Sequence, residues 1–179
     1  HRAVRDLLFN RDGLMLGICN GFQALVKLGL VPYGDIRPMD DECPTLTFNT
    51  IGRHQSRLVR TRVASNLSPW LSQCEPGDIH TVAISHGEGR FVCSPELQHQ
   101  LEVTGRIATQ YVDEAGQPSM DWDVNPNGSV MAIEGITSPD GRVLGKMGHV
   151  ERRGDGLYKN VPGNKFMPLF ESGVKYFTD

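Results

Sequence analysis

Residues Leu14–Gln23 read LMLGICNGFQ, and this stretch decides the fold. Its first five residues are apolar or glycine, as in a short strand buried on both faces, and a helical pattern follows up to Gly29. Gly17 and Gly21 flank Cys19 in a G-x-C-x-G pattern, which between a buried strand and a helix predicts a nucleophile elbow. The elbow places the sulfur at the N-terminus of the helix, where the helix dipole favours the reactive thiolate.

Glycine on both sides of Cys19 has a steric explanation. Because the turn is sharp, strand and helix approach closely, and we expect that neither Gly17 nor Gly21 could carry a side chain without a collision. The alternative interpretation is a structural cysteine in a glycine-rich turn, since free cysteines are often buried. The strand before Cys19 and the helix after it favour the nucleophile.

Apolar or alternating runs predict further strands. They cover residues 45–50, 57–63, 79–84, 107–112, 130–136 and 142–147. Ser68 and Ser94, each followed by proline, are typical helix N-caps, and Ser138–Gly141 is a turn between the last two strands. The elements do not alternate strictly, so we expect one domain over residues 1–179, an α/β core with an antiparallel extension.

Composition excludes several classes of protein. The chain has 179 residues, a net charge of −3 and no apolar run near the roughly 20 residues of a membrane-spanning helix. We therefore expect neither nucleic acid nor a membrane as partner. The four cysteines form no CxxC pair, so we expect no metal and a cytoplasmic protein with reduced thiols. The opening at His1 is typical of a helix already under way, which predicts a domain truncated at its N-terminus.

A cysteine nucleophile needs a base, and the base needs an acceptor that orients it. His149 is the strongest candidate, because Glu151 lies two residues further on and an extended backbone points both side chains the same way. Glu151 would then fix the imidazole tautomer whose other nitrogen faces Cys19. H-x-E alone is a weak pattern, and an exposed polar loop is the alternative. We expect three other histidines to be exposed or hydrogen-bonded, namely His54, His80 and His99.

Together, the elbow and the segment Gly148–Arg152 (GHVER) resemble the two triad motifs of class I glutamine amidotransferases. Within this class the chain is similar to the glutaminase part of phosphoribosylformylglycinamidine synthases. Its Cys19–Gly21, Ile84–Phe91 (ISHGEGRF) and Asn125–Ser129 (NPNGS) carry that similarity. The resemblance implies a flavodoxin-like fold with a mostly parallel central sheet.

The resemblance also implies a reaction. Cys19 attacks the side-chain amide of glutamine, ammonia leaves, and water hydrolyses the glutamyl thioester, with His149 carrying the proton and Glu151 orienting His149. The N–H of Asn20 would stabilise the oxyanion. The residues implied to hold glutamine are Gln23, His86, Gly87 and Glu88.

The partner that the resemblance implies is a synthase domain or subunit. It would take up the ammonia and use ATP and Mg²⁺ to convert formylglycinamide ribonucleotide to formylglycinamidine ribonucleotide, so no cofactor is expected in this domain. The NPNGS stretch by itself predicts only a turn. In the family, a loop at this place faces the synthase.

The chain departs from the family pattern in two ways. Val150 stands where the family often has proline between the histidine and the acid, although valine still permits the extended form. No glycine-rich loop precedes Cys19 to supply the second oxyanion donor, which is worth roughly 3 kcal/mol of barrier. We therefore expect the 179-residue chain alone to hydrolyse glutamine poorly.

Two alternatives stay open. One is another Cys-His-Glu hydrolase, such as a gamma-glutamyl hydrolase-like protein, against which Gln23 after the elbow favours glutamine as substrate. The other is a non-catalytic docking module, which would not need both His149 and Glu151.

Overall fold

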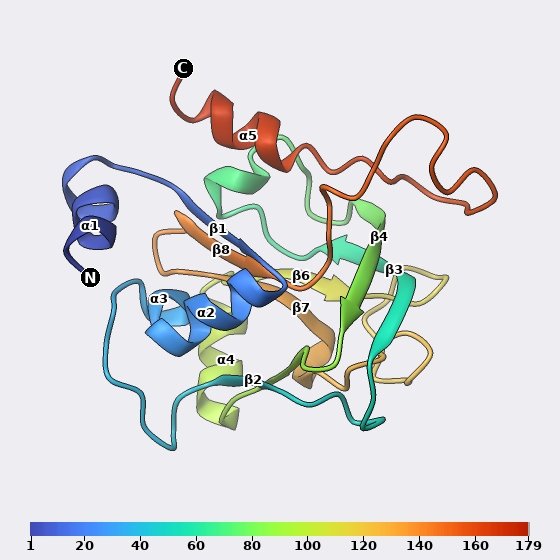
Figure 1. Ribbon diagram of the computed structural model, residues 1–179, viewed down its shortest axis with the longest axis horizontal. Helices are drawn as coiled ribbons and strands as arrows, with labels where there is room; N and C mark the ends of the chain where they lie inside the picture. The colour runs from blue at the N-terminus through green and yellow to red at the C-terminus, as the bar shows by residue number, and fades with distance from the viewer. Residues whose placement is uncertain (179) are drawn as a thin grey trace.

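A six-stranded sheet in the order β1-β8-β7-β6-β3-β4 forms the centre of the structure, a computed structural model that describes residues 1–178 (Figure 1). Its strands are β1 (Met15–Ile18), β3 (Gln55–Val63), β4 (Ile79–His86), β6 (Ile107–Tyr111), β7 (Ile133–Thr137) and β8 (Val143–Lys146). A separate two-stranded sheet pairs β2 (Thr45–Thr47) with β5 (Arg90–Val92).

Apolar side chains pack on both faces of the six-stranded sheet, because neighbouring residues of a strand point to opposite faces. Val143 belongs to one core cluster and Leu144 to the other. The first cluster includes buried residues of α2 (Asn20–Leu28), α3 (Leu30–Tyr33) and α4 (Pro95–Val103). The second includes Leu71 of η2 (Pro69–Leu71) and Leu169 of α5 (Leu169–Lys175), which lies on the opposite side of the molecule from α4 in Figure 1.

The remaining helical segments are short. α1 (Arg2–Arg5) and η1 (Asp6–Asn10) form the predicted opening helix, and η3 (Val130–Ala132) leads into β7. Among residues 1–178, no helix has the length and apolar character needed to cross a membrane.

The predicted α/β class is confirmed, but the sheet of the described residues contains less parallel pairing than predicted. Only β1 and β8 run parallel, and the other four neighbouring pairs are antiparallel. The connections explain the difference. β7 and β8 are joined by the predicted turn over residues 138–141, and strands joined so tightly run antiparallel, whereas parallel strands need a long crossover such as the one from β1 to β8.

Three elements differ from the sequence prediction. Residues 130–132 were predicted as strand but form a 3₁₀ turn, in which Met131 and Ala132 have φ of 52° and 54°. β5 was not predicted, because three residues are too few for an alternating pattern. α5 was not predicted either, because it lies in a segment rich in glycine and proline.

Candidate active site

Cys19 lies between β1 and α2 with φ of 55° and ψ of −109°. Non-glycine residues rarely adopt positive φ, and such backbone strain costs on the order of 1–3 kcal/mol. Two hydrogen bonds hold this conformation: the Cys19 N–H donates to the Lys146 carbonyl at 2.9 Å, and the Cys19 carbonyl accepts the Gln23 N–H at 3.1 Å. The structure therefore contains the predicted sharp turn.

The two glycines of the elbow differ in what surrounds them. A Cβ on Gly17 would lie 2.5 Å from the Leu25 side chain and 2.6 Å from the Gly21 backbone. A Cβ on Gly21 would meet nothing within 4 Å. The steric prediction is thus confirmed for Gly17 and wrong for Gly21, because only the Gly17 position lies between the strand and the helix.

The sulfur of Cys19 is buried where β1 and β4 end. Cys19 is 8% exposed, and its thiol donates to the carbonyl of Ser85 with a sulfur–oxygen distance of 3.8 Å. Burial raises the pKa of the Cys19 thiol, while the Asn20 N–H and the charge of Arg152 lower it and Glu151 raises it. Because the net shift is upward, the resting group is a thiol, contrary to the expectation that the helix dipole favours the thiolate. Its activation requires a base.

His149 is oriented by Glu151 as such a base requires, but in this structure the Cys19 thiol donates to the Ser85 carbonyl and not to His149 Nε2. Its Nδ1 lies 2.5 Å from Oε1 of Glu151, so the predicted hydrogen bond is present. The His149 N–H donates to the Ala83 carbonyl of β4 at 2.8 Å, and Val150 is buried in the core, so the segment is held in place without a proline. With Glu151 accepting from Nδ1–H, Nε2 is left as an acceptor. Within residues 1–178 this buried Nε2 has no hydrogen-bond partner.

Lys146 connects the nucleophile and the base. Its carbonyl binds the Cys19 N–H, while its ammonium donates to the Gly148 carbonyl at 3.0 Å and to Oε1 of Glu134 at 2.9 Å. Glu134 also accepts the Gly148 N–H at 2.5 Å, and both charged side chains are fully buried. Gly148 is therefore held at both its N–H and its carbonyl, directly before His149. Sequence reasoning missed this pair, although a single charge inside each of two apolar strands could have indicated it.

The residues predicted to bind glutamine or its oxyanion lie around one pocket. The side chain of Gln23 joins α2 to the turn after β4, because its Nε2 donates to the Glu88 carbonyl at 2.5 Å. The pocket at this junction has a volume of about 520 Å³. Its lining residues are Asn20, Gln23, Phe48, His54, Ser85, His86, Gly87 and Glu88.

His86 supports the turn from beneath. It is 4% exposed, its Nδ1 lies 3.2 Å from Oδ1 of Asn49, and a Cβ on Gly89 would lie 2.3 Å from its ring. Burial lowers the pKa of His86 to about 4, so its imidazole is neutral at pH 7.

The three other histidines considered in the sequence lie in different surroundings. His54 was given no role, but its Nε2 lies 3.0 Å from Oγ of Ser85 beside the pocket. His80 is 2% exposed, and its Nδ1 has no hydrogen-bond partner among the described residues. The expectation that His80 would be exposed or hydrogen-bonded is therefore not met at its Nδ1. His99 is exposed, as expected.

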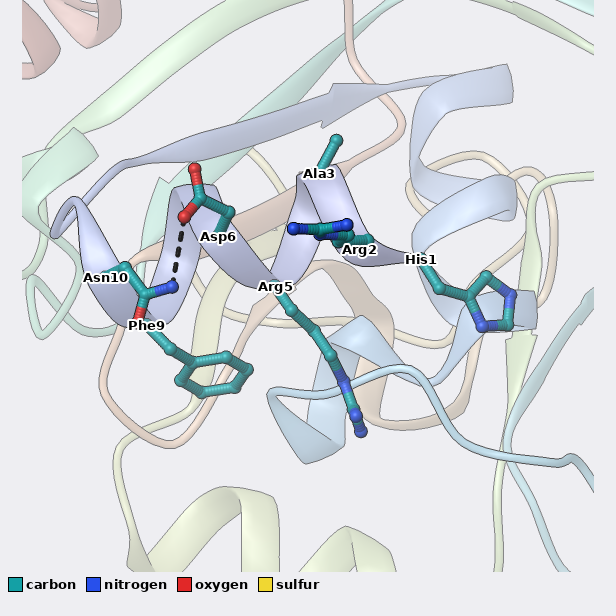
Figure 2. Close-up of a pocket in the computed structure, with 7 residues that line it drawn as sticks. All are labelled: His1, Arg2, Ala3, Arg5, Asp6, Phe9 and Asn10. Carbon is teal, nitrogen blue, oxygen red and sulfur yellow. Dashed lines mark hydrogen bonds between the residues drawn. The ribbon is translucent and has the colours of Figure 1, made fainter.

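A pocket of about 940 Å³ lies elsewhere, along α1 and η1 (Figure 2). Figure 2 shows Asp6 accepting a hydrogen bond from Asn10 beside the ring of Phe9. No predicted site residue lines this pocket. Over residues 1–178, no three His, Cys, Asp or Glu side chains gather so as to hold a metal ion, and the expectation of a metal-free domain stays a prediction.

Comparison with known proteins decides the family. A family model described as a CobB/CobQ-like glutamine amidotransferase domain matches residues 1–177. The chain belongs to this family.

Similar proteins include two from Synechococcus. The chain is 36% identical over 167 residues to the phosphoribosylformylglycinamidine synthase subunit PurQ of Synechococcus sp. (strain JA-2-3B'a(2-13)), covering 93% of the chain and 64% of that protein. It is 37% identical over 165 residues to PurQ of Synechococcus sp. (strain JA-3-3Ab), covering 92% and 63%. The chain therefore spans a little under two thirds of the length of these relatives.

A solved structure supports the same fold for this amidotransferase domain. The structure of PurLQS from Thermotoga maritima aligns with a TM-score of 0.68 and 26% identity, over 98% of this chain and 66% of the matched chain. The predicted glutamine amidotransferase fold is confirmed. The catalytic and binding roles of individual residues stay predictions, which the geometry above supports.

Proposed function

We propose that this amidotransferase domain is the glutaminase part of a phosphoribosylformylglycinamidine synthase and hydrolyses glutamine through a thioester on Cys19. One observation carries the proposal: a buried thiol on a strained elbow, together with a histidine whose Nε2 is buried and unpartnered. The names of the two Synechococcus relatives support the assignment to that synthase.

The first half of the reaction forms the thioester. His149 Nε2 takes the proton of the Cys19 thiol, and the sulfur attacks the side-chain amide carbon of glutamine. The negative charge that develops on the amide oxygen is stabilised by the Asn20 N–H at the start of α2. The protonated His149 then gives its proton to the leaving nitrogen, the carbon–nitrogen bond breaks, and ammonia leaves.

The second half regenerates the thiol. His149 accepts a proton from a water molecule, which attacks the thioester carbon, and the carbon–sulfur bond breaks. The sulfur recovers the proton from His149 and glutamate is released. Throughout, the hydrogen bond from His149 Nδ1–H to Glu151 keeps the ring oriented and stabilises its charged form.

The ammonia would pass to a synthase partner that activates formylglycinamide ribonucleotide with ATP and Mg²⁺. PurLQS of Thermotoga maritima, by its name, joins the PurQ type of chain with others in one assembly, which supports a synthase partner here. On this proposal the domain itself holds no cofactor, and the protein acts in the cytoplasm.

The decisive experiment treats the full-length protein with the glutamine analogue 6-diazo-5-oxo-L-norleucine and measures labelling of Cys19 by mass spectrometry. We expect labelling that glutamine blocks, glutaminase activity that is lost in step with labelling, and neither in Cys19→Ala. Labelling blocked by gamma-glutamyl peptides but not by glutamine would instead indicate a gamma-glutamyl hydrolase. A protein that is neither labelled nor releases ammonia would be a docking module.

A further inference from the structure

Three buried polar side chains surround the turn that joins β4 to β5, and the proposed reaction uses none of them. They are Asn49, 2% exposed, and Asn127 and Ser129, both 0% exposed. Asn127 and Ser129 belong to the NPNGS stretch, which by itself predicts only a turn and which the family resemblance places opposite the synthase. Burial of such groups is costly unless they are hydrogen-bonded, so their partners show what they do.

Asn49 binds the turn at four points. Its N–H donates to the Gly87 carbonyl at 2.9 Å, and its Nδ2 donates to the His86 carbonyl at 2.9 Å. Its Oδ1 accepts the Gly89 N–H at 3.1 Å and lies 3.2 Å from Nδ1 of His86. Asn49, with three contacts from its side chain and one from its backbone, therefore replaces the strand partner that this irregular backbone lacks.

Asn127 and Ser129 hold the other end of the turn. Asn127 Nδ2 donates to the Gly89 carbonyl at 2.5 Å, and the Ser129 hydroxyl donates to the same oxygen at 3.2 Å. Ser129 Oγ also accepts the Phe91 N–H at 3.0 Å. The two supports are themselves joined, because the Thr50 N–H donates to the Asn127 carbonyl at 3.1 Å.

The middle of the turn keeps two N–H groups that none of the three supporting side chains binds. The Glu88 carbonyl binds Gln23, while the N–H groups of Gly87 and Glu88 have no hydrogen-bond partner in residues 1–178. Both residues line the pocket of about 520 Å³. Two adjacent free N–H donors suit a carboxylate, and glutamine carries one at its amino-acid end.

We propose that Asn49, Asn127 and Ser129 are positioning residues that keep the turn over residues 86–90 in the shape that binds the α-carboxylate of glutamine. This inference rests on the proposed glutaminase function. Its consequence is specific: loss of a support weakens glutamine binding and leaves the chemistry at Cys19 unchanged, because none of the three side chains hydrogen-bonds to the thiol or to His149.

The test compares Asn127→Ala and Ser129→Ala with Asn66→Ala in the full-length protein. Asn66 is a matched control, because its Nδ2 also donates to a backbone carbonyl, that of Cys74 at 3.2 Å, but it does not contact the turn. We expect the KM for glutamine to rise at least tenfold in Asn127→Ala and at least threefold in Ser129→Ala. The kcat should stay within twofold in both, and Asn66→Ala should change neither value.

Labelling of Cys19 gives a second readout that a general loss of stability would not produce. Reaction with 6-diazo-5-oxo-L-norleucine should slow by the same factors, whereas alkylation by iodoacetamide, which has no α-carboxylate for the turn to bind, should keep its rate. If Asn127→Ala does not fold, the milder Ser129→Ala decides alone. An unchanged KM in a folded variant, or a fall in kcat at constant KM, would overturn the inference. A wild-type protein without glutaminase activity would instead refute the proposed function.

Discussion

The two sides of the site are built in different ways. On the reaction side, Cys19, His149 and Glu151 sit on short motifs at the ends of β1 and β8, and the turn at Cys19 and the hydrogen bond between His149 and Glu151 each form within one motif. On the binding side, the turn between β4 and β5 has almost no regular structure of its own and takes its shape from Asn49, Asn127 and Ser129. The difference shows that local sequence patterns can specify chemistry, whereas a binding surface depends on residues that are distant in the chain.

The largest effect should come from the reaction side, through Glu151→Gln. The amide oxygen can still accept the Nδ1–H hydrogen bond, but the amide carries no charge to stabilise the protonated ring and its NH2 group can favour the wrong tautomer, so we expect kcat to fall by about 10²–10⁴-fold. The KM for glutamine should change little, which is the opposite of the result for Asn127→Ala. Steady-state glutaminase kinetics measure both. A Glu151→Gln protein with a raised KM and an unchanged kcat would contradict the assignment of Glu151 to the reaction side.

Lys146→Met tests how the two catalytic motifs are held together. The substitution leaves Glu134 buried without its ion-pair partner, and we expect a loss of about 3–5 kcal/mol in the free energy of unfolding. The double variant Lys146→Met with Glu134→Leu should recover most of that loss, since no charge is then left buried. Urea denaturation of the wild type, the single variant and the double variant measures their free energies of unfolding. Equal stability of the single and double variants would contradict the expectation.

His86 makes the stability of the binding side depend on pH. Its pKa is about 4 in the folded protein and near 6.5 when unfolded, so the unfolded state binds more protons between these values. The contribution of His86 is therefore fully present above about pH 6.5 and is lost as the pH falls toward 4, a change on the order of 2–3 kcal/mol.

Unfolding in urea at pH 7 and at pH 4.5 measures this effect. The wild type should lose more stability on acidification than His86→Gln does. The exposed His99 provides the control, and His99→Gln should lose as much as the wild type. Equal losses in all three proteins would mean that another group accounts for the acid sensitivity.

The smallest expected effect is a difference in stability between alanine substitutions at the two glycines of the elbow. Gly17→Ala forces a methyl group against Leu25 and the Gly21 backbone, and we expect a loss of about 1–3 kcal/mol. Gly21→Ala fills open space inside α2, where alanine is the better helix former, so stability should stay within about 1 kcal/mol of wild type or rise. Thermal unfolding of both variants tests this, and a larger loss in Gly21→Ala would be the contrary result.

The sequence predicts the reaction side well because its information is local. Residues 14–29 contain the strand, the turn, the helix and the glycine that ends it, and Gly29 indeed has φ of 81°. The hydrogen bond between His149 and Glu151 likewise follows from a spacing of two residues. In each case the pattern that predicts the feature lies within the motif, although Lys146 and Ala83 also hold Cys19 and His149 through backbone hydrogen bonds.

The sequence does not predict the residues that support the binding side, because their partners are far apart in the chain. Asn127 and Gly89 are 38 residues apart, and Asn49 and His86 are 37 apart. A polar residue in a turn is normally exposed, so nothing in NPNGS indicates that Asn127 is buried. The parallel content of the sheet was overestimated for a similar reason, since strand pairing is set by connections rather than by the residues of a strand.

The burial of Cys19 has a consequence for oxidative damage. Peroxides react with thiolates and hardly with thiols, and here the sulfur is 8% exposed with a pKa that burial raises. Between catalytic cycles the sulfur is therefore poorly reactive toward cellular oxidants. On the proposed mechanism the sulfur becomes a strong nucleophile only while His149 holds its proton, so the resting thiol would be protected from oxidation.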